Sequence, residues 1–562
     1  MQASGLTSTL AGDKRTATLD TVTLDTAIFA PDDIWQSRLV TLGWMFVVLG
    51  ISLRVGRYLL NFPLWGDELF LAQNFLHRDY GDMFRPLSMA QIAPLPYLWI
   101  EITSIKLFGF SEWSLRLWSL IAAVSSVLLF HHLARRLLSP AATVLAVGVF
   151  AVSYHPIRHA AECKPYASDL MASLVLIVLA VRWWQSPENR RWLWALVAIG
   201  PLMVALSYPA VFVAGGVSLT LAWCVWTRKD YRALAPLAIY NLAFVGVFGL
   251  LLWLVSSGQY SDTRDFMLSY WAGGFPPANP LLLVKWLVMQ HAGEMMAYPI
   301  GDDHGGSAFS LLCFLVGVGA LVRRRQWTLM MLVLAPLALA FVASALRRYP
   351  YGGTRLSQWY APLACLMIGY GAAIAISWLK KSVDRRRTFV LATSLLLIVG
   401  GATLAKDMAK PYKRVVDFEH RGFVRWFWST HNAAAKVVCV RTDLGKDFFH
   451  GLVGEDYICY QRIYSAPHRS GTRELDLNDT ADGRPLRCVL YWDQGVNRNE
   501  EEFNAWMDEM TTRYDLAGDQ TYRVKLNGPR EPDRVGCYQV YEFRPKAFSA
   551  NSVPGSSAAE LR

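Results

Sequence analysis

About eleven long apolar stretches constrain the fold of this chain more than any other feature of its sequence. They cover residues 38–57, 114–133, 141–155, 167–184, 192–208, 210–226, 233–255, 307–322, 327–346, 357–378 and 388–405. A helix needs about 20 mostly apolar residues to cross roughly 30 Å of hydrocarbon. The sequence therefore predicts a polytopic α-helical membrane protein of about eleven transmembrane helices, in agreement with a mean hydropathy of +0.24 and 18% charged residues.

Basic residues gather in alternate loops between these stretches, at 131–136, 190–191, 228–232, 323–325 and 380–387. Because cytoplasmic loops are enriched in Lys and Arg, these loops and a disordered tail at 1–37 are predicted to be cytoplasmic. The net charge of +11 then reflects membrane topology and does not indicate nucleic-acid binding. The opposite, outer face should carry residues 58–113, 156–166, 207–210, 256–306, 347–356 and 406–562.

The segment 93–110 is apolar but contains Glu101 and Lys106. A membrane crossing here would break the alternation of loop charges. We therefore predict an amphipathic helix that lies in the outer membrane interface.

The C-terminal part of the chain is more polar, and residues 406–545 are predicted to form an outer-face (periplasmic) α/β domain. Strands are expected near 435–440, 487–492 and 536–543, and helices at 418–434 and 498–513. Residues 546–562 are expected to be a disordered tail. The cysteines of this domain could form two disulfides, with three possible connectivities, or remain buried thiols; they are Cys439, Cys459, Cys488 and Cys537.

An acidic pair, Asp67 and Glu68, follows the first apolar stretch directly. Carboxylates at a membrane face lose hydration, so such groups usually bind a cation, pair with a basic group, or act as acid or base. Other polar residues fall on the same predicted face: Arg54, Arg57, Arg116, Glu162, Lys164, Tyr166, Arg348 and Arg355. Arginine matches phosphate oxygens with a fork of donors, which suits an anionic lipid head group.

Several of these residues also have purely structural interpretations. Asp67 could cap a helix that begins at Glu68, Arg116 could anchor at the interface, and Glu162 could pair locally with Lys164. His155 and His159 have the i, i+4 spacing of metal ligands, but structural histidines are the simpler interpretation. Asp302, Asp303 and His304 are weak candidates for a divalent metal site; otherwise they form a solvated loop.

Four ordered segments resemble motifs of a known family. They are Trp65-Gly-Asp67-Glu68-Leu-Phe-Leu-Ala, the stretch from Ala93 to Arg116 with Leu107-Phe-Gly-Phe-Ser-Glu, His159-Ala-Ala-Glu162-Cys-Lys164-Pro-Tyr166, and Arg355-Leu-Ser-Gln-Trp-Tyr-Ala-Pro. Together they resemble lipid-linked-sugar glycosyltransferases of the GT-C fold. The nearest branch is the bacterial relatives of protein O-mannosyltransferases and aminoarabinose transferases (glycosyltransferase families 39 and 83). The chain departs from the family at Lys164, where Arg is common, and after Arg355, where a Tyr is missing.

The resemblance implies a GT-C-like catalytic domain over residues 38–405 that moves a sugar from polyprenyl phosphate to an acceptor, with inversion. It implies a general base at Asp67 and a donor-phosphate site drawn from Arg54, Arg57, Arg116, Lys164, Arg348 and Arg355. Glu68 is a second catalytic candidate that could orient the acceptor, or it could pair with an arginine. Glu162 and Tyr166 would contact substrate. No cofactor is certain, although a divalent metal is possible. The acceptor would be a glycan, glycolipid or protein at the outer face of a bacterial inner membrane.

The alternative from another class of protein is a transporter or flippase for a lipid-linked saccharide. Transporters place ion-binding groups near the bilayer midplane, in broken helices. Here the ionisable residues fall in loops on one predicted face. That distribution favours the enzyme.

Overall fold

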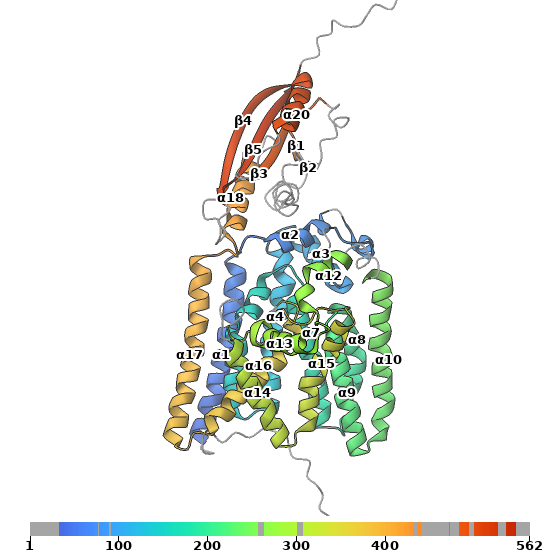
Figure 1. Cartoon of the computed structure of the whole chain (residues 1–562), viewed down its shortest axis with the longest axis vertical. Coiled ribbons are helices and arrows are strands. Elements are labelled where there is room, and N and C mark those ends of the chain that lie inside the picture. The colour runs from blue at the N-terminus through green and yellow to red at the C-terminus, as the bar shows by residue number, and fades with distance from the viewer. Residues whose placement is uncertain are drawn as a thin grey trace, which may run out of the picture.

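The protein is a helical bundle with a small α/β domain at one end (Figure 1). This computed structural model describes residues 28, 33–76, 78–88, 91–256, 264–300, 307–353, 355–430, 435–439, 471–472, 483–493, 500–525 and 535–546. Each predicted apolar stretch coincides with a helix. The helices are α1 (Asp33–Leu59), α4 (Ser114–Leu137), α5 (Pro140–Val152), α7 (Tyr166–Gln185), α8 (Arg191–Leu206), α9 (Ala210–Arg228), α10 (Leu234–Leu251), α14 (Ser307–Arg323), α15 (Trp327–Ala345), α16 (Ala361–Ser377) and α17 (Ser382–Ala409).

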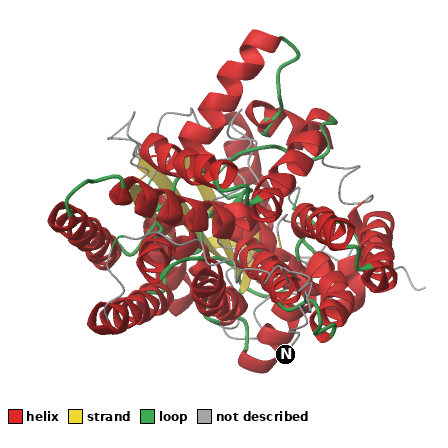
Figure 2. Ribbon diagram, turned by 90° about the horizontal axis from the view of Figure 1, so that it is seen from below, coloured by secondary structure: helices red, strands yellow, loops and turns green. Residues whose placement is uncertain are grey.

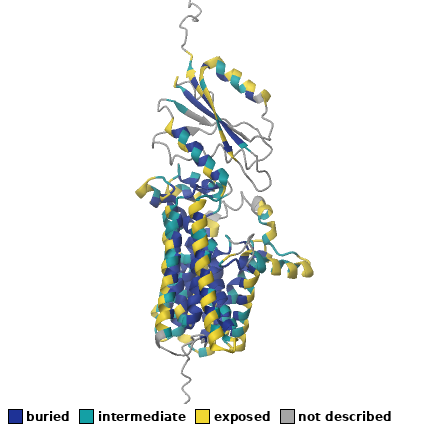
Figure 3. Cartoon of the chain, turned by 90° about the vertical axis from the view of Figure 1, so that its left-hand side faces the viewer, coloured by how far each residue is buried: buried dark blue, intermediate teal, exposed yellow. Residues whose placement is uncertain are grey.

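Eight of the described helices are long and apolar enough to cross a membrane, or nine if α5 and the bent segment after it count as one span. α8 and α14 are shorter apolar helices. A polytopic membrane protein is thus confirmed, with fewer full-length spans than the predicted eleven. The bundle is buried along its centre and exposed on its rim (Figure 3), where apolar side chains such as Leu242, 76% exposed, face outward as lipid-facing residues do.

The central helices approach closely at glycine positions. A side chain at Gly369 in α16 would collide with the backbone of Ala146 in α5, and one at Gly371 would collide with the carbonyl group of Cys313 in α14. Small residues of this kind let membrane helices pack backbone to backbone, where dispersion and not the hydrophobic effect drives association.

α5 ends abruptly, and this break brings a polar segment to the bundle end. Proline cannot donate a backbone hydrogen bond, and its ring clashes with the carbonyl group four residues earlier. Pro156 would meet Val152 in this way, so α5 stops at Val152 and the chain bends by 51° into α6 (Tyr154–Arg158). A 3-10 turn, His159–Ala161, and residues 162–165 then lead into α7.

The first loop forms a cap over the same end of the bundle, which we call the domain end. Its elements are α2 (Gly66–Ala72), the 3-10 turns Gln73–Phe75 and Tyr80–Phe84, and α3 (Leu95–Phe108). The helix predicted at 93–110 is present as α3, but its polar pattern differs from the expectation. Lys106 is exposed and pairs with Asp79 at 2.7 Å, whereas Glu101 is fully buried inside the protein because α3 packs against α4.

The loop predicted at 256–306 contains short helices. They are α12 (Arg264–Tyr270), the 3-10 turn Ala272–Gly274, α13 (Pro280–Gln290) and the π-helical turn His291–Met295. α13 overlaps the bundle in the view of Figure 1 and projects sideways from it in the turned view of Figure 3, and its apolar residues are exposed, Leu281 by 83%. Its contacts include the Trp286 Nε1 hydrogen bond to the Gly273 carbonyl oxygen at 2.8 Å.

The C-terminal domain begins with α18 (Val415–Ser429), directly after α17. Its sheet has the order β2-β1-β3-β5-β4, from β1 (Lys436–Cys439), β2 (Gly471–Thr472), β3 (Leu486–Asp493), β4 (Tyr514–Lys525) and β5 (Val535–Pro545), with α20 (Glu500–Arg513) packed on it. β1 pairs in parallel with β2 and β3, while β5 pairs antiparallel with β3 and β4. Viewed along the bundle from its opposite end, the sheet lies behind the helices (Figure 2).

The three predicted strands and both predicted helices of this domain are present, whereas the short strand β2 and the long strand β4 were not expected. Cys488 is a free, buried thiol, in line with the second alternative for the cysteines. Cys459, the side chain of Cys439, and most residues of both predicted disordered tails lie outside the described part of the chain.

Candidate functional site

Asp67 and Arg355 form an ion pair at the domain end. Asp67 lies in the first turn of α2, and its side chain remains 27% exposed. It does not cap the helix: the N-cap residue is Trp65, whose backbone N–H faces the Glu68 carboxylate at 3.4 Å. The structure therefore leaves Asp67 partly open, with one carboxylate oxygen held by an arginine.

Arg355 is carried by the loop between α15 and α16, which contains two glycines in left-handed conformation. Gly352 has φ +87° and Gly353 has φ +82°, a region that L side chains rarely adopt. The guanidinium donates to the Tyr270 hydroxyl at 2.9 Å and lies 4.8 Å from the centroid of the Trp271 ring. Burial opposes its charge, but Tyr166 and Asp67 outweigh burial and raise the pKa of Arg355.

The segment after the α5 break supplies a second group of charges. The carboxylate of Glu162 accepts from Arg158 Nε at 2.6 Å and lies 2.8 Å from His159 Nδ1. Burial favours the neutral acid, but Arg158 and His159 outweigh it and hold the pKa of Glu162 well below its ordinary value. The alternative pairing of Glu162 with Lys164 is not found. Lys164 donates instead to Gln91 Oε1 at 2.5 Å.

Lys164, Tyr166 and Arg355 all lie within electrostatic range of Asp67. Burial lowers the pKa of Lys164, and Asp67 partly opposes that effect. The ring of Tyr166 packs on His159 with a centroid distance of 4.7 Å. The structure thus brings together four of the residues that the sequence suggested, with Glu162 adjacent to them.

Glu68 is placed differently from its expected catalytic role. Its carboxylate is 1% exposed and is bound by Arg116, with Nη2 at 2.6 Å and Nε at 2.8 Å, and by the backbone N–H of Cys163 at 2.7 Å. Arg116 also donates to the carbonyl oxygen of Phe62. Because both groups are buried and fully engaged, the pair positions the loop that carries Asp67, and Arg116 is not available to a donor phosphate.

Three other arginines also depart from the expected phosphate site. Arg54 is fully buried and donates to the carbonyl oxygens of Gly50, Phe150 and Ala151, which fixes α1 against α5. Arg57 is buried in an ion pair with Asp407 of α17. Arg348 is exposed at the end of α15.

Lys413 is a residue that sequence reasoning missed. It lies between α17 and α18, and its ammonium sits over the indole ring of Trp65. Burial and the nearby Arg158 lower the pKa of Lys413 to about 7, and Glu162 and Asp67 oppose this. The available signal was a basic cluster, 410–414, that follows the last span on the predicted outer face, against the trend of the other loops.

Metal binding has no geometric support among the described residues. No group of three or more His, Cys, Asp or Glu side chains is placed there to hold an ion. The candidates Asp302, Asp303 and His304 lie outside the described ranges. His155 and His159 have stacked rings with centroids 6.4 Å apart, and the Nδ1 atom of His159 is engaged by Glu162.

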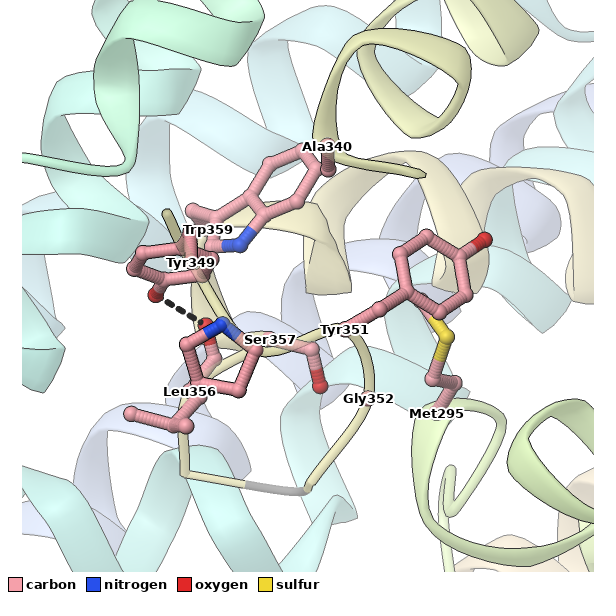
Figure 4. A pocket seen from close by; sticks show the side chains of 9 residues that line it. Met295, Ala340, Tyr349, Tyr351, Gly352, Leu356, Ser357 and Trp359 are labelled. Carbon is pink, nitrogen blue, oxygen red and sulfur yellow. Dashed lines mark hydrogen bonds between the residues drawn. The ribbon is translucent and has the colours of Figure 1, made fainter. Parts of the chain in front are cut away.

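A small cavity lies beside the loop that carries Arg355 (Figure 4). Residues of that loop line it, with Met295, Ala340 and Trp359 on other sides, and the Tyr349 hydroxyl donates across its rim to the carbonyl oxygen of Leu356 at 2.9 Å. Its volume is about 10 Å³, room for about one water molecule. It is therefore a packing feature and not a substrate pocket.

Comparison with known proteins gives one family. Residues 93–253 match the dolichyl-phosphate-mannose-protein mannosyltransferases. The matched range runs from the start of α3 to the end of α10 and includes Arg116, Glu162, Lys164 and Tyr166; Asp67 and Arg355 lie outside it. The match confirms the resemblance to this mannosyltransferase family, which was inferred above from short motifs.

Solved structures similar to the chain are found at low sequence identity. ArnT from Cupriavidus metallidurans in the apo state is 12% identical, with a TM-score of 0.49 and coverage of 90% of this chain and 98% of that one. An Archaeoglobus fulgidus oligosaccharyltransferase tethered with an acceptor peptide is 12% identical, with a TM-score of 0.41 and coverage of 79% and 64%. A search of curated proteins gave no match.

Proposed function

We propose that this protein transfers a sugar from a polyprenyl-phosphate donor to an acceptor at the domain end of the bundle, with Asp67 as general base. The observation that carries the proposal is a partly exposed carboxylate paired with Arg355 and near Lys164. Such a site offers a proton acceptor beside cations that suit a phosphate. The family match adds the donor class, because the family is described by its dolichyl-phosphate-mannose substrate.

The reaction is a single displacement at the anomeric carbon. Asp67 takes the proton of an acceptor O–H or N–H as that heteroatom forms its bond to the sugar. The bond between the anomeric carbon and the phosphate oxygen breaks, and its electron pair leaves with polyprenyl phosphate. Attack from the opposite face inverts the configuration, and a nearby carboxylate stabilises the cation-like sugar.

Arg355 has two roles in this scheme. Before substrate arrives it orients the carboxylate of Asp67. Its fork of donors also matches phosphate oxygens, and the charge that develops on the leaving phosphate draws the guanidinium toward it. Donor binding then frees the carboxylate oxygen for the acceptor proton. Because phosphate leaves readily as an anion, no second carboxylic acid is required, in keeping with the structural placement of Glu68.

The domain end would face the periplasm in a bacterial inner membrane. This orientation rests on the basic loops, which join the spanning helices at the opposite end of the bundle (Figure 1). A lipid-linked donor reaches the site laterally from the bilayer, while a glycan, glycolipid or protein acceptor approaches from the aqueous side.

The test compares Asp67→Asn with wild type in membranes that receive radiolabelled polyprenyl-phosphate hexose and crude cell-envelope acceptor. Asp79→Asn is the matched control, because Asp79 is an exposed acid of the same loop. We expect label transfer by wild type and the control, and a loss of at least about 100-fold in Asp67→Asn, the scale of a removed general base.

Equal transfer by Asp67→Asn and wild type would reject Asp67 as the base. Absence of transfer by every variant across hexose, pentose and uronic-acid donors would reject the transferase and favour the transporter. Protein level and melting temperature are measured in parallel, so that loss of folded protein is not mistaken for loss of chemistry.

A further inference from the structure

Lys413 lies in the short junction that joins the membrane bundle to the C-terminal domain. α17 ends at Ala409 and α18 begins at Val415, and both ends are held. On one side, Asp407 is bound to Arg57 of α1. On the other, Arg421 of α18 donates to the backbone oxygen of Asn61 at 2.6 Å. The junction is therefore fixed against the start of the first loop.

The ammonium of Lys413 enters the charged site from this junction. It lies over Trp65, the N-cap residue of the helix that carries Asp67. Groups from every neighbouring element act on it electrostatically. They are Asp67 of α2, Arg158, His159 and Glu162 of the segment after α5, and Arg414 and Asp417 of its own segment.

None of the neighbouring carboxylates is a dedicated partner for Lys413. Glu162 is engaged by Arg158 and His159, and Asp67 by Arg355. Among the described residues, no hydrogen bond or ion pair reaches the Lys413 ammonium. A half-buried cation without an anionic partner is unfavourable, so this arrangement favours an external anion.

The charges around Asp67 also leave an excess of cations. Three carboxylates, those of Asp67, Glu162 and Asp417, face five cations: Arg158, Lys164, Arg355, Lys413 and Arg414. The buried Glu68–Arg116 pair is neutral overall and does not change this excess. A phosphate group is the anion that such a set of donors suits.

We infer that Lys413 is a donor-binding residue whose ammonium contacts the phosphate oxygens of the polyprenyl-phosphate substrate. The inference rests on the proposed function, and it assigns part of the active site to the junction outside the matched range 93–253. It gives the C-terminal domain a defined task. α18 packs with the first loop in one apolar cluster that includes Leu64, Phe423 and Tyr538, so the domain holds Lys413 over the donor site.

Binding of undecaprenyl phosphate to the full-length protein in nanodiscs tests the inference without requiring turnover. The variants are Lys413→Gln, Lys413→Arg and the matched control Lys410→Gln, an exposed lysine three residues earlier in the same junction. We expect Lys413→Gln to weaken binding about 10- to 100-fold, since a charge-assisted hydrogen bond contributes about 1.5–3 kcal/mol. Lys410→Gln should remain within about threefold of wild type, and Lys413→Arg, which keeps the charge, should retain more affinity than Lys413→Gln.

Uncharged undecaprenol separates the contribution of the phosphate to binding from that of the lipid chain. All variants should bind undecaprenol with the same affinity. Equal affinity of wild type and Lys413→Gln for the phosphate would overturn the inference and leave the proposed function standing. An equal loss of affinity for undecaprenyl phosphate and for undecaprenol in Lys413→Gln would also overturn the inference, because a purely structural role of Lys413 over Trp65 predicts that result. If wild type itself does not bind the phosphate, the donor class of the proposed function fails as well.

Discussion

Arg57 of the first spanning helix and Asp407 of the last form a buried ion pair, with one guanidinium nitrogen 2.7 and 2.6 Å from the two carboxylate oxygens. This contact joins the ends of the bundle across 350 residues of sequence. It also fixes the last turn of α17, from which the chain continues to Lys413. Arg57 thus has a structural role in this pair, whereas the sequence suggested that it binds the donor phosphate.

Arg57→Gln should lower stability and leave donor affinity intact. Removing one partner strands a buried charge, which typically costs about 3–5 kcal/mol. Thermal unfolding in detergent would measure the loss, and the double variant Arg57→Met/Asp407→Leu should recover part of it because neither charge remains. Weaker binding of undecaprenyl phosphate at an unchanged melting temperature would instead return Arg57 to the donor site.

Glu68→Gln should behave in the opposite way to Asp67→Asn. Glu68 is buried against Arg116, so its neutral variant leaves an arginine uncompensated and should cost about 3–5 kcal/mol of stability. Asp67 is partly exposed, and Asp67→Asn should change the unfolding free energy by less than about 1 kcal/mol while transfer is lost. The free energy of unfolding and the rate of sugar transfer are both measured on one preparation of each variant. A stable Glu68→Gln protein without activity would restore Glu68 as a catalytic group.

Arg355→Lys should impair donor use although it keeps the charge. Lysine lacks the planar fork that can bind phosphate bidentately and stack on Trp271. We expect kcat/KM for the donor to fall at least about tenfold, which corresponds to about 1.4 kcal/mol. Tyr270→Phe removes the 2.9 Å hydrogen bond to Arg355 and should cost about 0.5–1.5 kcal/mol. Equal kinetics of wild type and Arg355→Lys would exclude a bidentate contact.

Donor binding should weaken as the pH rises through about 7, because the pKa of Lys413 is lowered to about 7 by burial and Arg158. The protonated ammonium binds phosphate, so binding is strongest below this pKa and is lost above it. Burial also raises the pKa of Asp417 to about 7. Because Asp417 is present in both proteins, the comparison of wild type with Lys413→Arg isolates the effect of Lys413. Arginine stays charged, so its affinity for undecaprenyl phosphate should vary less between pH 6 and 8. Identical pH profiles of the two proteins would contradict the assignment.

Much of the fold follows from local composition. The spanning helices are predictable because each must bury its backbone polar groups within a continuous apolar run, and β1, β3 and β5 because their side chains are strongly apolar. β4 escaped prediction because most of its residues are exposed at the sheet edge, as in Asp515–Leu516 and the charged positions that follow. A solvated edge strand lacks the alternation that marks a buried one.

The site was only partly predictable for a related reason. Asp67, Lys164, Tyr166 and Glu162 lie in short motifs whose membrane side follows from loop charge. The partners of Arg54, Arg57 and Arg116 depend on contacts between distant helices, and an arginine on a helix end looks the same whether it faces a carboxylate or a ligand. Lys413 lies in a segment without a motif, and only the tertiary packing of α18 brings it over Trp65.

The sideways helix α13 makes the bilayer itself a structural component of this protein. The exposed leucines and valines of this helix pack against the hydrocarbon of the bilayer. Trp286 of the same helix contacts the ring of Tyr351 at a centroid distance of 5.7 Å, and Tyr351 precedes Arg355 by four residues. Lipid that packs on α13 therefore surrounds a helix that contacts the loop carrying Arg355. Replacing lipid by detergent changes the surroundings of that loop without changing the chain itself.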